Sequence, residues 1–349
     1  MSEAFREQEA CLPGIGFRDA LRRDSCPGWT FVRRFFTSRL RRCYVREFHI
    51  FDTARREHPG VAMTLPTFFI IGAPKAGTTS LHHYLDQHPQ IQMSAIKEPR
   101  FFALPESGEA QLPGRIATLA EYEALFDPAV AVRGESSTDY AAHPRREGAP
   151  ERIRELVPEA RFIYLVRDPI ERSVSHYRMA AALMGEKRPL AEALRDALDD
   201  PASRYISPSL YATQLELYLR HFPAERILVV DQAQLLAERR ATLAEVFSFL
   251  AVADEIDAAA LTEEKLSSAQ WRAAPEGYAG FVGRYVTPRV RWVPRGLRRS
   301  VRGALERALW RPIDASLDDE LRARLEALYA PEAERLRQLT GGRFASWAV

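Results

Sequence analysis

The sequence predicts an α/β fold with a central parallel sheet of about five strands flanked by helices. From residue 67 onward, short apolar runs alternate with helical stretches, and turn residues close each run before the next helix candidate begins. Runs that are apolar at nearly every position are typical of strands covered on both faces, which is the situation of strands in a parallel sheet.

Four apolar runs have the form of buried strands: Thr67–Ile71, Ala131–Glu135, Arg161–Arg167 and Arg226–Asp231. Apolar residues at helical spacing predict helices over Thr78–Gln87, Ile170–Met184, Tyr211–Arg220, Ala233–Leu250 and Asp318–Gly341. Residues 88–130 form a long connection with a weak strand signal. Long connections in compact α/β domains commonly carry function, so we expect this one to build a binding surface.

The chain divides by composition into a basic N-terminal arm over residues 1–64, partly helical, and a single domain over residues 65–349. The net charge of +2 does not indicate a bulk nucleic-acid binder, and we expect no nucleic-acid partner. No apolar stretch is long enough to span a bilayer and the first 30 residues lack an apolar signal core, so we expect a cytoplasmic protein. All three cysteines lie in the arm without metal-ligand spacing, which argues against a zinc site or a disulfide framework.

Within the arm, Phe31–Arg46 contains six arginines and no acid, with apolar residues at helical spacing. This pattern indicates a basic amphipathic helix. We favour packing of its apolar stripe on the domain. Peripheral docking on an anionic membrane surface is the alternative.

The first strand is followed by the loop Gly72–Gly77 and then by a helix that opens with hydroxyl residues. In this arrangement, backbone N–H groups and a helix N-terminus hold a phosphate. Gly77 permits close approach of the anion, and threonine hydroxyls add donors. We therefore predict a P-loop-like three-layer fold with an anion site formed by Lys75, Ala76, Gly77, Thr78, Thr79 and Ser80.

This loop departs from that of nucleotide hydrolases at its defining position. Their lysine directly follows the second glycine and precedes the Ser or Thr that holds magnesium. Here Thr78 follows Gly77, and the lysine lies earlier, at Lys75. We therefore expect no metal, and interpret Asp231 at the end of its strand as a cap instead of a magnesium-binding aspartate.

A second anion site is predicted where the strand Arg161–Arg167 ends and Pro169 opens a helix. Arg167 at the sheet's carboxyl end and Ser175 two turns later would face the crevice where open α/β sheets bind ligands. The alternative is a capped helix start with a solvated Arg167. The nearby Lys75 loop favours the anion site. We expect Arg172 and Arg178 on this helix to lie at the surface.

These elements, in this order, resemble the family of sulfotransferases that use 3′-phosphoadenylyl sulfate (PAPS). Pro74–Thr79 matches the family's first signature, and Lys97-Glu-Pro-Arg-Phe-Phe102 resembles an element of its carbohydrate branch, similar to heparan sulfate sulfotransferases and their bacterial relatives. The resemblance covers residues 65–341. It implies transfer of a sulfuryl group from PAPS to a hydroxyl or amine of a small-molecule or glycan acceptor, without a metal.

The same resemblance implies roles for individual residues. Arg167 and Ser175 would hold the 3′-phosphate of the nucleotide, and Lys75 would stabilise charge on the leaving phosphate. Glu98 matches the position of the general base. Asp139 is a weaker candidate for that role.

Other matches leave alternatives open. Tyr211 would line the nucleotide pocket, with a core tyrosine as the alternative. The segment Gly134–Tyr140 resembles a strand-end element that lines the active site. A basic residue among Lys265, Arg272 and Arg284 is expected to close over the nucleotide. Three histidines beside the first helix, at positions 82, 83 and 88, are expected to pack or to lie at the surface.

Two other classes of function remain open at the level of sequence. One is a magnesium-dependent P-loop kinase or hydrolase of ATP or GTP. The other is a non-catalytic protein that keeps the anion loop as a scaffold. Preference for 3′,5′-ADP over 5′-ADP without magnesium would separate the sulfotransferase from both.

Overall fold

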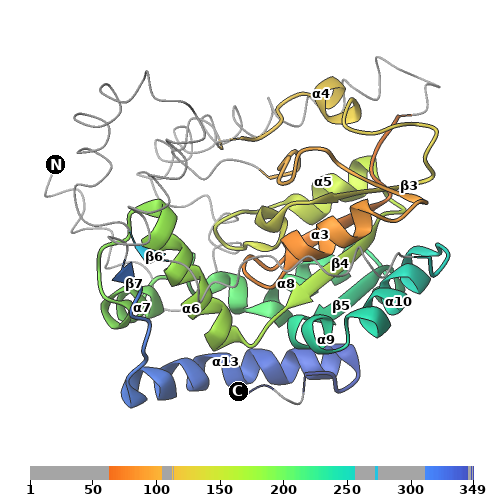
Figure 1. Cartoon of the computed structure of the whole chain (residues 1–349). Helices are drawn as coiled ribbons and strands as arrows, with labels where there is room; N and C mark the ends of the chain where they lie inside the picture. The colour runs from red at the N-terminus through yellow and green to blue at the C-terminus, as the bar shows by residue number, and fades with distance from the viewer. Residues whose placement is uncertain are drawn as a thin grey trace, which may run out of the picture. The chain divides into compact units, whose positions relative to one another are not determined.

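A computed structural model describes residues 63–103, 112, 114–255, 272–273, 311–344, 347 and 349 (Figure 1). The predicted helix Phe31–Arg46, the three cysteines, Lys265 and Arg284 lie outside these residues. Arg272 belongs to β6 (Arg272–Ala273), which pairs antiparallel with β7 (Arg311–Pro312).

Five parallel strands form the main sheet of the described chain, in the order β2-β3-β1-β4-β5, which confirms the predicted fold class (Figure 1). Their bounds are β1 Phe68–Gly72, β2 Ile91–Met93, β3 Val132–Ser136, β4 Arg161–Val166 and β5 Ile227–Asp231. All residues of β1 are buried, as expected for a central strand. Because every strand is parallel, all five carboxyl ends meet at one edge of the sheet.

Helices cover both faces of this sheet (Figure 1). The α-helices of the described chain are α3 (Thr78–Asp86), α4 (Leu119–Glu123), α5 (Ala149–Leu156), α6 (Pro169–Met179), α7 (Leu190–Leu198), α8 (Tyr211–Leu219), α9 (Gln232–Ala237), α10 (Arg239–Leu250) and α13 (Asp319–Thr340). On one face, His88 after α3 packs against Phe247 of α10, with ring centroids 4.6 Å apart. On the other, Phe162 of β4 packs against Tyr218 of α8, with centroids 5.0 Å apart.

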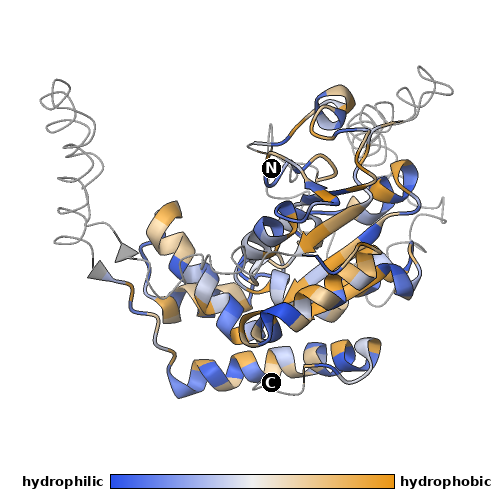
Figure 2. Cartoon of the chain, turned by 45° about the vertical axis from the view of Figure 1, so that its right-hand side comes forward, coloured by the Kyte–Doolittle hydropathy of each residue, from blue (hydrophilic) through white to orange (hydrophobic). Residues whose placement is uncertain are grey.

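A second apolar cluster joins α6, α7 and α13. Ile170 and Val174 of α6, Leu194 of α7, and Leu321 and Leu325 of α13 are all buried in it. Figure 2 shows hydrophobic colour concentrated along the strands, whereas the surrounding helices carry both colours. α6 is therefore covered on the side of α7 and α13 as well as toward the sheet.

The structure differs from the predicted elements in several places. The helix expected over Ala233–Leu250 is two helices, α9 and α10, because Glu238 leaves the helical backbone at φ −125°. The helix expected over Ile170–Met184 ends its α-helical part at Met179 and continues as a π-helix over Ala180–Met184. Short elements in other connections, β2, α4, α5 and α7, were not anticipated.

None of the helices within the described ranges combines the length and the apolar character needed to cross a membrane.

Candidate active site

The Lys75 loop joins the end of β1 to the start of α3. Gly77 caps α3 at φ 95°, in the left-handed region that glycine adopts without steric cost. The loop is tied to the neighbouring strand, because Ala73 N–H donates to the Leu165 carbonyl of β4 at 2.6 Å. The first N–H groups of α3 have no intrahelical acceptor and carry the positive end of the helix dipole. The predicted anion site therefore has the local geometry that anion binding requires.

The electrostatic surroundings of Lys75 are strongly positive. Burial, followed by the charges of Arg167, Arg172 and Lys97 in that order, lowers the pKa of Lys75 to about 8. These cations come from the end of β4, from α6 and from the connection after β2. The fold therefore gathers basic side chains around the loop, and an anion bound there would favour the charged form of Lys75.

Glu98 lies beside the carboxyl end of β3, in the connection that follows β2. Its backbone has φ 63°, and its N–H donates to the Ser136 carbonyl at 2.9 Å. One carboxylate oxygen accepts from the Thr138 N–H at 2.9 Å, and the other lies 2.9 Å from Lys97 Nζ. The side chain is 21% exposed. Glu98 is thus held in place yet accessible.

Thr138 is a site residue that sequence reasoning missed. Its Oγ1 lies 3.2 Å from Glu98 Oε1, so its hydroxyl donates to the same carboxylate as its backbone N–H. The available signal was its place within Gly134–Tyr140, the strand-end segment predicted to line the site.

Asp139 forms ion pairs with arginines at the carboxyl edge of the sheet. Its oxygens lie 3.0 Å from Arg100 Nε, 3.3 Å from Arg145 Nη2 and 3.8 Å from Arg146 Nε. Both carboxylate oxygens therefore face guanidinium groups, and this environment suits an anchor for arginines better than a proton acceptor.

Arg167 and Ser175 lie at the end of β4 and within α6. The predicted helix cap is present, since Asp168 Oδ1 accepts from the Glu171 N–H at 2.9 Å. Arg167 also contacts Glu171, with 3.1 Å between Nη2 and Oε2, and remains 21% exposed. Ser175 is buried.

Tyr211 lies in the core beside this second site. It is 1% exposed, and its hydroxyl donates to the Arg167 carbonyl at 2.8 Å. Its ring packs edge-on against Tyr164. Tyr211 thus braces the backbone at the end of β4, which is the geometry of the core tyrosine that the sequence left as an alternative.

Comparison with known proteins agrees with this geometry. The family model described as "Sulfotransferase family" matches residues 66–255, more than half of the chain. The chain belongs to the sulfotransferase family.

Relatives of this sulfotransferase chain include two enzymes named for heparan sulfate. Human bifunctional heparan sulfate N-deacetylase/N-sulfotransferase 2 is 26% identical over 213 residues, covering 54% of this chain and 22% of the relative. Mouse heparan sulfate glucosamine 3-O-sulfotransferase 3B1 is 32% identical over 196 residues, covering 53% of this chain and 46% of the relative. The chain thus spans less than half the length of either relative.

A solved structure shares the fold of this sulfotransferase. The sulfotransferase from Alicyclobacillus acidocaldarius superposes with a TM-score of 0.59 at 23% identity. The match covers 83% of this chain and the whole of the other.

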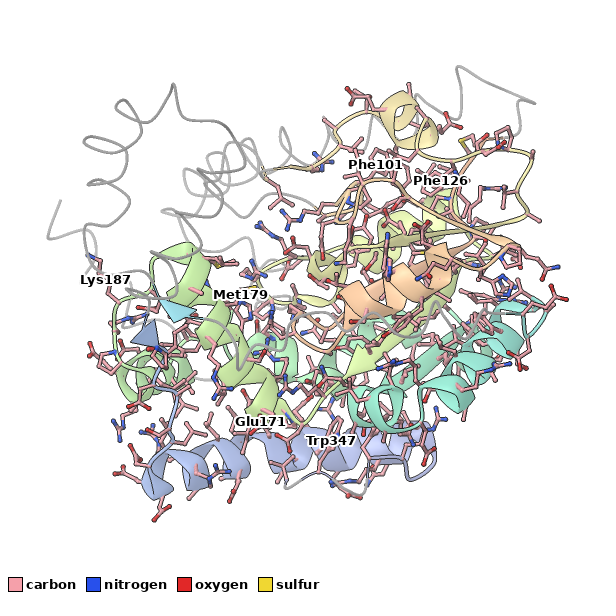
Figure 3. All side chains as sticks on the ribbon, viewed as in Figure 1. Phe101, Phe126, Glu171, Met179, Lys187 and Trp347 are labelled. Carbon is pink, nitrogen blue, oxygen red and sulfur yellow. The ribbon has the colours of Figure 1, made fainter. Side chains whose placement is uncertain are left out.

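The expectation that Arg172 lies at the surface of the sulfotransferase is wrong. Arg172 is 0% exposed, because its side of α6 is covered by the segment around Tyr205 and Ser209 and by α13. Figure 3 labels Glu171 in the first turn of α6 and Met179 at its last residue. Arg178, one and a half turns further along the helix, is partly exposed.

A second ionisable side chain of the sulfotransferase, Glu135 of β3, is fully buried. Burial raises its pKa to about 8, although the hydroxyls of Tyr140 and Tyr122 offset part of the rise. Glu135 is therefore predominantly neutral at pH 7, while Glu98 nearby is paired with Lys97. The two carboxyl groups occupy different electrostatic environments.

The histidines near α3 have no favourable setting for proton abstraction. Burial, followed by the charge of Lys97, lowers the pKa of His82 to about 4. His88 Nε2 lies 2.8 Å from the Ala253 carbonyl, and its Nδ1 accepts from the Gln90 N–H.

The interpretation of Asp231 as a cap is confirmed. Its Oδ1 accepts from the Ala233 N–H at 2.9 Å at the start of α9, and its Oδ2 accepts from Trp347 Nε1 at 3.2 Å. Within the described part of the sulfotransferase, no group of three or more His, Cys, Asp or Glu side chains is placed to hold a metal ion.

Proposed function

We propose that this chain transfers a sulfuryl group from PAPS to a hydroxyl or amine of a carbohydrate acceptor. The observation that carries the proposal is the joint placement of Lys75 and Glu98 at the carboxyl edge of the sheet. Lys97 connects them, because its ammonium lies 2.9 Å from Glu98 Oε1 and its charge also lowers the pKa of Lys75. An anion-binding cation and an accessible carboxylate therefore share one site.

The chemistry of sulfuryl transfer assigns a task to each group. The acceptor oxygen or nitrogen forms a bond to sulfur while the bond from sulfur to the phosphate oxygen breaks, leaving 3′,5′-ADP. Lys75 and the N-terminus of α3 stabilise negative charge on the departing phosphate. The Glu98 carboxylate receives the proton of the acceptor. Thr138 and Lys97 hold Glu98 ready for this step.

The identity of donor and acceptor is supported by different observations. Arg167 and Ser175 lie on the strand and helix next to the Lys75 loop, where they would receive the 3′-phosphate of PAPS. Similarity to N- and 3-O-sulfotransferases of heparan sulfate supports a carbohydrate acceptor, with transfer to nitrogen or to oxygen.

Calorimetry tests the donor. We expect 3′,5′-ADP to bind without magnesium and 5′-ADP to bind much more weakly. Preference for ATP or GTP with magnesium would instead favour a kinase or hydrolase.

Transfer of labelled sulfate from PAPS to a panel of glycans, glycolipids and phenols tests the acceptor. Lys75→Ala is expected to lower turnover by about 100- to 1000-fold, the usual cost of removing a preorganised stabiliser. Glu98→Gln is expected to abolish transfer while nucleotide binding persists. The Arg178→Met variant serves as control, because Arg178 lies on α6 outside the proposed site. Nucleotide binding without transfer to any acceptor would favour a scaffold.

A further inference from the structure

Arg172 in the second turn of α6 is a buried cation whose hydrogen-bond partners are all uncharged. Its Nε donates to Ser209 Oγ, and one Nη2 bond goes to the Tyr205 carbonyl. Nη2 also lies 3.4 Å from Ser173 Oγ, and Nη1 lies 3.1 Å from His176 Nδ1. The guanidinium is therefore hydrogen-bonded but not electrically balanced.

The titratable groups around Arg172 in the described part of the chain do not supply a countercharge. Burial, followed by the charge of Arg172, lowers the pKa of His176 well below 6.5, so this imidazole is neutral. Burial raises the pKa of Tyr164, Tyr211 and Tyr329 on β4, α8 and α13, so these phenols are neutral as well. Among the described residues, no carboxylate lies within ion-pair distance of the guanidinium.

A buried charge without a counterion is costly, and proteins usually pair such a charge. The field of Arg172 extends to the Lys75 loop, where it disfavours the charged form of Lys75. Arg167, which follows β4 and precedes the same helix, also lowers the pKa of Lys75. An anion at the carboxyl edge of the sheet would supply the countercharge that Arg172 lacks among the described residues.

We propose that Arg172 is a positioning residue for the nucleotide, whose unpaired buried charge is balanced by the phosphate groups bound at the Lys75 loop. This inference rests on the proposed use of a nucleotide sulfate donor. Arg172 acts through the field it adds to the site, because its hydrogen bonds are directed to protein groups. The same cluster joins α6 to α13, since Ser173 Oγ lies 2.8 Å from the Tyr329 hydroxyl.

The test separates charge from structure with three variants. Arg172→Met removes the charge and keeps much of the volume, and Arg172→Lys keeps the charge without the guanidinium fork. Ser209→Ala removes one acceptor of the guanidinium, together with the hydrogen bond that this hydroxyl donates to the Pro169 carbonyl. The affinity for 3′,5′-ADP is measured by calorimetry, and folding stability by urea unfolding. The Arg178→Met variant controls for loss of a helix arginine.

Across these variants, we expect the affinity for 3′,5′-ADP to depend on the positive charge at position 172 and not on folding stability. Arg172→Met should weaken binding about tenfold, because the site loses the attraction of one unit charge for the phosphates. Arg172→Lys and Ser209→Ala should bind within about threefold of the parent although both are less stable, because they retain the positive charge.

Other results would overturn the inference. If the parent binds 3′,5′-ADP and folded Arg172→Met binds equally well, Arg172 has only a structural role. If Arg172→Met does not fold, Arg172→Lys and Ser209→Ala decide. Retained affinity for 3′,5′-ADP at reduced folding stability supports a role for the charge of Arg172. A parallel loss of affinity and stability refutes that role. Failure of the parent to bind 3′,5′-ADP contradicts the proposed function itself, which is a different outcome.

Discussion

The lowered pKa of Lys75 predicts that nucleotide binding takes up a proton. In the free protein this pKa is about 8, because burial and neighbouring cations disfavour the ammonium. A phosphate beside Lys75 favours the charged form and raises the pKa toward its ordinary value of 10.5. At pH values near or above 8, binding must therefore be coupled to protonation of Lys75.

The size of this uptake follows from the two pKa values. At pH 8 about half of Lys75 is neutral in the free protein, and almost none in the complex, so roughly 0.5 proton is taken up per nucleotide. At pH 7 the neutral fraction is about a tenth, and uptake falls to roughly 0.1 proton. The phosphates of the nucleotide, with a second pKa near 6, are already ionised at pH 8.

Calorimetry of 3′,5′-ADP in buffers of different ionisation enthalpy measures this quantity. The slope of the observed binding enthalpy against buffer ionisation enthalpy gives the number of protons taken up. Lys75→Ala should remove the uptake at pH 8, whereas Lys187→Ala, which replaces an exposed lysine labelled in Figure 3, should preserve it.

The reasoning about Lys75 fails if the parent binds the nucleotide at pH 8 with no proton uptake. It fails equally if the uptake is the same in the parent and in Lys75→Ala, because another group would then be titrating.

Three further predictions concern the strand beside the site and its end. Glu135→Gln should remove a pH dependence of stability. In the parent, native Glu135 keeps its proton up to about pH 8, whereas the carboxyl of the unfolded chain loses its proton near pH 4.5. The free energy of unfolding of the parent therefore falls as the pH rises between these values, by up to about 1.4 kcal/mol per pH unit. Urea unfolding from pH 5 to 8 checks this, and equal slopes in parent and variant would contradict it. Gly134→Ala should destabilise the fold by about 1–3 kcal/mol, because the added Cβ would lie 2.1 Å from Cζ of the buried Phe68 ring. An unchanged midpoint of urea unfolding would argue against this contact. Thr138→Val should lower the turnover number about two- to tenfold, because Glu98 loses a hydroxyl donor while keeping the backbone one. Steady-state kinetics with saturating PAPS measures that effect, and unaltered turnover would remove Thr138 from the site.

Local patterns were sufficient to predict much of the sheet and its phosphate loop. Strands β1, β4 and β5 and helices α3, α8 and α13 agree with their predicted bounds within one or two residues. Apolar runs and helical periodicity are properties of short segments, so they can be recognised without any tertiary information. The three-residue strand β2 was not predicted, because it is too short to carry a pattern of its own and is defined by pairing with β3.

The break between α9 and α10 shows a second limit. The periodicity of Ala233–Leu250 predicted one helix, yet the helix is interrupted at Glu238 without a proline or glycine. The direction of the chain at this break depends on how α9 and α10 each pack against the rest of the fold. Helical periodicity carries no information about that packing.

By itself, the sequence determined the alternation of strands and helices, the glycine loop with Lys75 ahead of Gly77, and the cap at Asp231, because each depends on neighbours along the chain. Tertiary structure alone decided that Arg172 is buried, that Thr138 holds Glu98, and that Glu135 is neutral. Burial and charge balance are set by segments far apart in sequence. Two arginines on one helix, Arg172 and Arg178, therefore looked alike until the packing of α6 against its neighbours distinguished them.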